Sequence, residues 1–403
     1  MKRSGTADLA LFGGGIPPWL FDRMVALSLP VVEAIIQEKG KKEFLSRLSD
    51  PFWFQSFGAV IGMDWNSSGV TTAVLRALKQ SLNPHAKELG LFVCGGKGRD
   101  STRTPAELLR VGEQTGLDGD ELARCSKLSA KVDNTAVQDG FQLYLHGFLV
   151  SDEGDWTVIQ QGMQGATGLA RRYHWHSAGI TSFVEEPHAA ILGDNQGDIL
   201  NLVAKAAQPT QQGILEISQE NPATLLREVP HMKLPTYYDV KAKDVDLKRL
   251  GSILYLAQEA ETDNFADLLL LKGLGPRTLQ SLTLVSEVIH GTPSRFSDPA
   301  RFSFAHGGKN AKPFPVLTST YDETIATLQE SVRLAKIGHT DKQRAIKKLG
   351  ELSRKLEEGF TPNGDFQAVI DRENRDAHKY GGRRISERKK KPEPPSDQLR
   401  LFE

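Results

Sequence analysis

The chain has 403 residues, of which 39% are hydrophobic and 25% charged, and its 50 basic residues balance its 50 acidic ones. This composition is typical of a soluble protein long enough for two domains. Its two cysteines exclude a disulfide framework or a cysteine-based zinc site, and no apolar run approaches the roughly 18 residues of a membrane span. Glycines at 13–15 and prolines at 17 and 18 interrupt the start, which therefore lacks a secretory signal. We expect a cytoplasmic protein without a membrane partner.

The predicted elements alternate between strands and helices first and become helical later. In chain order, we predict a helix over 19–39 with a break at Pro30, a strand over 57–63, a helix over 70–82, strands over 89–94, 141–150, 156–161 and 180–184, and helices over 247–262, 265–271, 277–290 and 321–358. The fold class that follows is an α/β N-terminal domain plus a mainly α-helical C-terminal domain. We place them at 1–205 and 206–375, followed by a disordered basic tail at 376–403.

Residues 269–282 match the helix-hairpin-helix pattern, in which an apolar helix ends at two closely spaced glycines and a second helix starts at once. Glycine permits the backbone conformations and the close phosphate approach that a Cβ atom opposes, and Pro276 fits the first turn of the new helix. The free amides of that turn form an anion site for a DNA phosphate. The alternative is a purely structural helical corner. The residues predicted to contact DNA here are Lys272, Gly273, Gly275, Arg277 and Thr278.

A similar hairpin precedes the catalytic aspartate of base-excision glycosylases, and Asp298 is the residue that would correspond to it. Two features of the sequence disagree with that model. Arg277 stands where a nucleophilic lysine is expected, and the segment 297–309 does not resemble a glycosylase signature. Alternatively, Asp298 caps a turn before Pro299.

Three acids of the first domain are candidates for catalysis and for metal binding. Asp64 follows a predicted strand, and Asp133 and Asp139 lie in a later acidic segment. If they converge, these carboxylates can hold Mg²⁺ or Mn²⁺ for phosphodiester hydrolysis, since hard cations prefer oxygen ligands.

Further candidates lie in three segments rich in glycine, arginine or histidine. Lys97 belongs to a glycine-rich loop after a strand, but the loop lacks the spacing of an NTPase. Residues 171–176 supply Arg171 and Arg172 as DNA contacts and His174 and His176 as acid–base groups; alternatively, the segment is a strand with Tyr173 and Trp175 in the core and the histidines outside. The third segment adds His306 and Lys309 as catalytic candidates.

The pentapeptide at 398–402 follows a basic, proline-rich stretch and resembles the peptide by which bacterial replication and repair proteins bind the sliding clamp of DNA polymerase. In such a peptide a leucine and an aromatic residue enter an apolar pocket, and the glutamine forms hydrogen bonds at its edge. The stretch before it has almost no apolar residues and is expected to act as a flexible tether. Chance similarity and folding back onto the body are the alternatives. The predicted clamp-binding residues are Gln398, Leu399, Leu401 and Phe402.

Most of residues 1–375 resembles a family of bacterial and archaeal proteins defined only as a domain of unknown function, DUF763. The segments that carry the resemblance include KRSGTADL near the start, DWNSSGVTT, CGGKG and FAHGGK. The resemblance implies no activity and assigns no catalytic residue.

Taken together, these patterns indicate a DNA-binding repair or replication-associated protein of the nucleoid, with DNA and the sliding clamp as partners. The favoured hypothesis is a metal-dependent nuclease tethered to the clamp. The alternatives are a glycosylase using Asp298 and a non-enzymatic adaptor.

Overall fold

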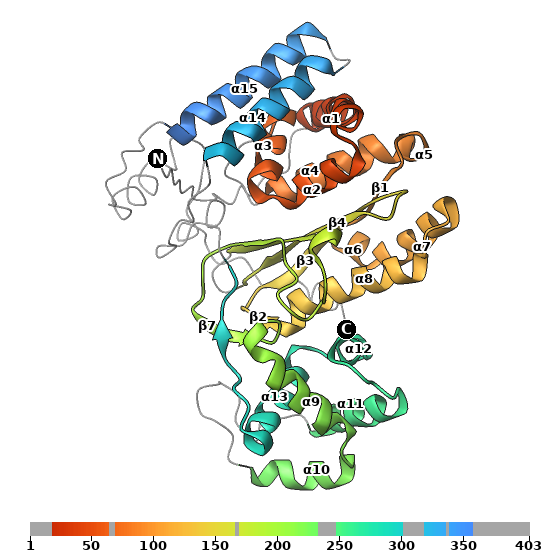
Figure 1. Cartoon of the computed structure of the whole chain (residues 1–403), viewed down its shortest axis with the longest axis vertical. Coiled ribbons are helices and arrows are strands. Elements are labelled where there is room, and N and C mark those ends of the chain that lie inside the picture. The colour runs from red at the N-terminus through yellow and green to blue at the C-terminus, as the bar shows by residue number, and fades with distance from the viewer. Residues whose placement is uncertain are drawn as a thin grey trace.

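A five-stranded antiparallel sheet forms the middle of the molecule (Figure 1). The structure is a computed structural model, and it describes residues 18–63, 69–165, 169–232, 247–300, 318–335 and 338–357. Its strand order is β1-β3-β4-β5-β6, and a second sheet has the order β2-β7-β8. The strands are β1 (Leu91–Lys97), β2 (Val137–Gln138), β3 (Gln142–Ser151), β4 (Trp156–Met163), β5 (Ala170–His176), β6 (Ala190–Leu192), β7 (Asp198–Asn201) and β8 (Phe296–Ser297).

Helices surround this sheet, so the coarse prediction of a mixed α/β protein is confirmed. The helices are α1 (Pro18–Lys39), α2 (Lys41–Ser49), α3 (Pro51–Ile61), α4 (Gly69–Leu82), α5 (Ala86–Leu89), α6 (Arg99–Thr102), α7 (Thr104–Thr115), α8 (Gly119–Lys131), α9 (Gln208–Gln219), α10 (Pro222–Glu228), α11 (Leu247–Glu259), α12 (Phe265–Leu270), α13 (Pro276–His290), α14 (Thr318–Leu334) and α15 (His339–Glu357). One turn of π-helix, η2 (Val132–Ala136), follows α8 directly, and short 3₁₀ turns lie at Asn83–His85, Ser177–Gly179, Lys205–Ala207 and Val229–His231. Within the described ranges, no helix is long and apolar enough to cross a membrane.

Each face of the large sheet is covered by its own hydrophobic core. Along β3, Leu145 and Leu149 pack with α1–α4, whereas Phe148 and Val150 pack with α7, α8 and the helices α9–α13. This alternation follows from the two-residue period of a strand. Because both faces are buried, the strands carry long buried runs rather than a polar face.

The predicted strand over 57–63 is wrong, because its residues belong to α3 and the short turn that ends it. Asp50 caps α3 by accepting a hydrogen bond from the Trp53 amide at 2.7 Å, and Pro51 occupies the first turn. Every residue of α3 is buried. A helix buried on all sides shows no amphipathic period, so a short apolar run cannot be distinguished from a buried strand.

Three further expectations need correction. Residues 180–184 form a loop instead of a strand, and 321–358 contains two helices, α14 and α15, rather than one. The helix α1 continues through Pro30. The other predicted helices and strands are present, with ends that differ by a few residues.

The helices predicted for the second domain pack in two places. The helices α9–α13 share a core with α8, β2 and β7, whereas α14 contacts α1 and α15 contacts α3 (Figure 1). The strand β8, which follows α13, also pairs with β7. The packing therefore joins the hairpin region closely to the sheet, and the boundary at residue 206 stays a prediction.

Candidate functional site

The segment that matches the helix-hairpin-helix pattern folds as α12, a tight turn at 271–275, and α13. The backbone of Gly273 has φ +87°, a conformation that side-chain-bearing residues rarely adopt. Gly275 precedes α13 with an extended backbone, and no side chain of the described residues caps the helix. The first hydrogen bond of α13 runs from the Leu279 amide to the Gly275 carbonyl at 3.0 Å. The amides before it have no helical acceptor, so they face outward as donors.

The surface of this turn is open and basic. A Cβ atom added at Gly275 would meet no atom of the described residues within 4 Å. Lys272 and Arg277 are both exposed, whereas Thr278 is buried. The turn therefore presents amide donors and two cations to the solvent, but the Thr278 side chain does not join them.

The turn is held in place by the end of α8 and by β2. The Lys131 ammonium donates to the Leu274 carbonyl at 2.6 Å, and the Gln138 amide donates to the Pro276 carbonyl at 2.7 Å. Leu274 itself is fully buried in the core beneath. The hairpin is thus fixed against the part of the chain that carries Asp133.

Asp133 lies in the π-helical turn η2 and is fully buried. Gln160 and Trp175 donate to its carboxylate at 2.5 and 2.9 Å, and the Nε2 atom of His188 lies 2.5 Å from its other oxygen. Burial raises the pKa of Asp133, and the neighbouring His188 opposes that rise. The hydrogen bonds from Gln160 and Trp175 also favour the ionised carboxylate.

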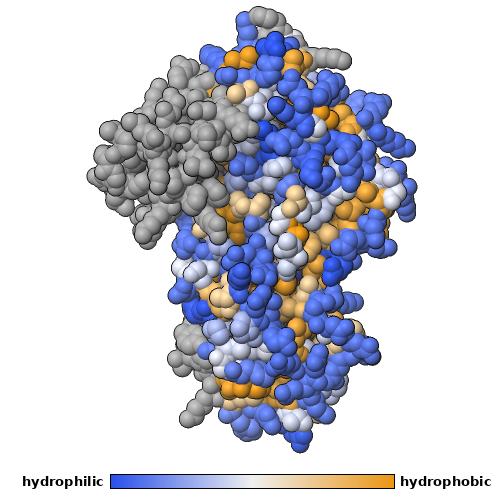
Figure 2. Space-filling view, in the orientation of Figure 1, coloured by the Kyte–Doolittle hydropathy of each residue, from blue (hydrophilic) through white to orange (hydrophobic). Residues whose placement is uncertain are grey.

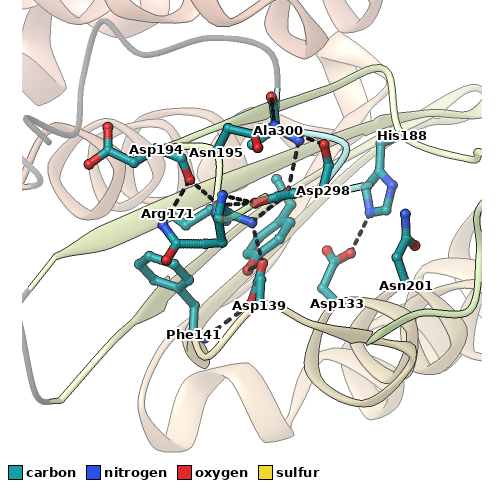
Figure 3. Close-up of polar contacts among 12 residues, drawn as sticks. Asp133, Asp139, Phe141, Arg171, His188, Asp194, Asn195, Asn201, Asp298 and Ala300 are labelled. Atoms are coloured by element: carbon teal, nitrogen blue, oxygen red, sulfur yellow. Dashed lines mark hydrogen bonds and ion pairs between the residues drawn. The ribbon is translucent and has the colours of Figure 1, made fainter. Parts of the chain in front are cut away.

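The pair of Asp133 and His188 is a feature that the sequence analysis missed (Figure 3). The Nε2 atom of His188 shares a hydrogen bond with Asp133, and within the described part of the chain its Nδ1 atom has no hydrogen-bond partner. The His188 side chain is 6% exposed, and the centre of its ring lies 4.4 Å from the centre of the Trp175 ring. A carboxylate that holds an imidazole through one ring nitrogen leaves the other nitrogen in position to exchange a proton with a substrate or water, as in a general base oriented by a carboxylate.

A buried hydrogen-bond chain extends inward from Asp133. Gln160 bridges Asp133 to His146, whose Nδ1 lies 2.8 Å from the Gln160 carbonyl oxygen, and the other ring nitrogen lies 2.9 Å from the Ser126 hydroxyl. Burial lowers the pKa of His146 to about 4, so the ring is neutral near pH 7. When the His146 ring is neutral, Ser126 donates to His146 and His146 donates to Gln160. Each hydrogen bond in this series then has its donor on the side away from Asp133 and its acceptor on the side nearer to it.

Asp139 and Asp298 also converge, but they do so on Arg171 (Figure 3). The guanidinium lies 2.7 Å from an oxygen of each carboxylate, and all three side chains are fully shielded from solvent. Asp139 also accepts from the Tyr173 hydroxyl at 2.7 Å and the Phe141 amide at 3.0 Å. Burial raises the pKa of Asp139, and Arg171 opposes that rise.

The same triad changes the interpretation of Asp298. Its oxygens accept from Arg171 and from the amides of Gln196 and Ala300, at 2.7 and 3.0 Å respectively. It therefore closes the turn before Pro299, as the structural alternative predicted, and joins the segment after α13 to β5. A buried, paired carboxylate in this position is not presented to a nucleic acid.

Arg172 and His174 lie on the opposite face of β5. Arg172 is 1% exposed and bonds to Gln55, Thr71 and the Nε2 atom of His174, the last at 2.9 Å. No carboxylate of the described residues pairs with it, and burial lowers its pKa to about 9. Burial and the Arg172 charge hold the pKa of His174 well below its usual range. The predicted DNA contacts of Arg171 and Arg172 are thus not supported, since neither guanidinium reaches the surface.

The residues placed here do not fit a divalent metal ion. The oxygens of Asp133 and Asp139 are already occupied by hydrogen-bond donors, and Arg171 supplies the positive charge between Asp139 and Asp298. In the ranges that the structure describes, no group of three or more histidine, cysteine or carboxylate side chains could hold a metal. The binding of Mg²⁺ or Mn²⁺ stays a prediction from the sequence.

The remaining candidates are separate from these clusters. Lys97 is exposed at the end of β1, with its ammonium 5.6 Å from the centre of the Tyr144 ring. His176 is half-buried, with Nδ1 at 3.1 Å from the Trp156 carbonyl, and burial lowers its pKa. Seven predicted site residues lie outside the described residues: Asp64, His306, Lys309, Gln398, Leu399, Leu401 and Phe402.

Comparison with known proteins identifies a family without assigning an activity. No curated protein and no solved structure matches the chain. The model of a family described as a protein of unknown function, DUF763, matches residues 5–316, somewhat less than the span of the expected resemblance. Because that match covers more than half of its length, the chain belongs to the DUF763 family.

Proposed function

We propose that this protein binds the DNA backbone through the hairpin formed by α12 and α13. The observation that supports this proposal is the turn at 271–275, where an uncapped helix start, an open position at Gly275 and two exposed cations face the same solvent. Amides at a helix start, together with its dipole, favour a phosphate. Such contacts position DNA without selecting a sequence.

The test is a salt titration of DNA binding. Replacement of both Lys272→Ala and Arg277→Ala should reduce the slope of log affinity against log salt by about 2, and by the same amount for unrelated duplex sequences. A matched control is the pair Lys39→Ala and Lys87→Ala, two exposed lysines on α1 and α5. Equal slopes for the two double variants would refute the proposal.

We further propose that the peptide at 398–402 binds the bacterial sliding clamp and so concentrates the protein at replicating or repaired DNA of the nucleoid. The support is its sequence, with Leu401 and Phe402 as the anchors. The double change Leu401→Ala and Phe402→Ala should abolish clamp binding in calorimetry and leave clamp-free DNA binding unchanged. Retained clamp binding would contradict this part of the proposal.

A hydrolytic reaction on DNA is a second candidate function, favoured by the Nδ1 atom of His188, which has no hydrogen-bond partner among the described residues. Its test is incubation with single-stranded, duplex, flapped, uracil-containing and abasic DNA in Mg²⁺, Mn²⁺ or EDTA. Cleavage that is lost in His188→Ala and Asp133→Asn, with DNA binding retained, supports a nuclease whose base is His188. Abasic products in EDTA favour a glycosylase, and binding without cleavage indicates an adaptor.

A further inference from the structure

The helix α8 runs beside the hairpin and is tied to it at two points. Near the start of α12, the Arg124 guanidinium pairs with Asp267 at 2.9 Å. At the turn, the Lys131 ammonium bonds to the Leu274 carbonyl. The last two turns of α8 therefore lie along α12 and end at the predicted phosphate site.

Lys127 lies between these two anchors on the same stripe of α8. It is three residues after Arg124 and four before Lys131, and residues with this spacing are neighbours on a helix surface, about 5–6 Å apart at Cβ. The cations on either side are engaged with the hairpin. Lys127 is exposed and pairs with no carboxylate of the described residues.

We infer that the Lys127 ammonium forms a second contact to the DNA backbone, so that α8 extends the interface that begins at the hairpin turn. This inference rests on the proposed DNA binding by the hairpin. Each strand of DNA carries a phosphate about every 3.4 Å along its axis, so a strand that contacts the turn has further phosphates within reach of a neighbouring lysine.

The distribution of charge along α8 indicates where a DNA strand would cross this helix. The first turn of the helix is acidic, with Asp118 as the cap followed by Asp120 and Glu121, which are largely exposed. These carboxylates repel phosphate, whereas the last two turns are basic. The strand is therefore expected to cross α8 near Lys127 and to leave the helix before its acidic start. In Figure 2, hydrophilic residues cover much of the face shown, and hydrophobic residues gather in several areas among them.

The experiment compares Lys127→Ala, Lys127→Arg and the control Lys87→Ala in the full-length chain, by fluorescence anisotropy with labelled duplex at several salt concentrations. Lys127→Ala should lower the salt slope by about 1 and the affinity about five- to tenfold at 0.1 M salt. Lys127→Arg and Lys87→Ala should retain the wild-type slope. Thermal unfolding should be the same for all four proteins, because an exposed lysine contributes little to stability.

Two results would overturn the inference, and they have different meanings. An unchanged slope for Lys127→Ala, with a reduced slope for the double change at Lys272 and Arg277, rejects the α8 contact but leaves hairpin binding intact. An unchanged slope for both rejects the proposed function as well as the contact.

Discussion

The turn at 271–275 and the clusters around Asp133 and Arg171 beside β5 are both rich in charged side chains. They differ in whether those charges are paired inside the protein or exposed to solvent. Around Arg171, two carboxylates and a guanidinium neutralise one another out of contact with water. At the hairpin turn, cations and amide donors are left facing the solvent. Charge that is satisfied internally contributes to stability, whereas charge that faces outward is available for a partner. Substitutions in the first region should therefore affect folding, and substitutions in the second should affect binding.

The largest effect is expected from Arg171→Met. The change leaves Asp139 and Asp298 buried without their cation, and breaking a buried ion pair in this way costs about 3–5 kcal/mol. Urea unfolding of the variant and the wild type measures the loss.

Arg172→Met is the matched control, because Arg172 is equally buried on the same strand but leaves no carboxylate unpaired among the described residues. It should cost clearly less than Arg171→Met. Equal losses would show that the buried guanidinium matters only through packing, and the contrast between satisfied and free charge would lose its basis.

The next effect concerns pH and His146. Burial lowers the pKa of His146 from 6.5 to about 4. Between pH 6.5 and pH 4, His146 is therefore protonated in the unfolded chain and neutral in the folded protein. Stability should therefore fall as the pH drops from 6.5 to 4, by on the order of 3 kcal/mol from this group. In His146→Gln that contribution is absent, and the unfolding free energy should depend less steeply on pH.

The comparison must use slopes rather than absolute stabilities, because the glutamine also alters hydrogen bonds with Ser126 and Gln160. His174 has a lowered pKa too and remains in both proteins, so it cancels in the difference. Parallel pH curves for the two proteins would mean that His146 is protonated or hydrated in the folded state.

The hairpin could be predicted because its signal is local. Its residues lie close together in the chain: the two glycines, Pro276 and the flanking leucines. The glycines allow the backbone of the turn, and the proline suits the first turn of the following helix. The structure has helices at Phe265–Leu270 and Pro276–His290, close to the predicted ranges, and their identity as a DNA-binding helix-hairpin-helix stays a prediction. The strands β3 and β4 could be predicted from the sequence for the same reason, since one short turn joins two long apolar runs.

The acid clusters could not be predicted, because their members are far apart in the chain. Arg171 and Asp298 are separated by 127 residues, and Asp133 and His188 by 55. The sequence suggested Asp133, Asp139 and Asp298 for their chemistry, but a single chain does not reveal which cation they meet. His188 had no motif around it, and only its distance from Asp133 distinguishes it from any other histidine.

A smaller effect on stability is expected at Gly273. Its φ of +87° is unfavourable for a residue with a Cβ atom, although the added atom would meet only the Ile253 side chain at 3.8 Å. The change Gly273→Ala should therefore cost about 1–2 kcal/mol of unfolding free energy through backbone strain. Chemical denaturation measures it, and Gly98→Ala at φ +61°, also in open space, provides a strained control away from the hairpin.

The smallest effect on stability is expected at Gly275, where binding and folding should separate. Its extended backbone suits any residue and the space beside it is open, so Gly275→Ala should change the unfolding free energy by less than about 0.5 kcal/mol. The same methyl group stands where a phosphate is proposed to approach, so DNA affinity should fall about fivefold, or about 1 kcal/mol. Anisotropy and urea unfolding on one preparation test both halves. A loss of stability with unchanged affinity would reverse the assignment, because the turn would then resemble the cluster at Arg171: a region whose chemistry is used to hold the fold.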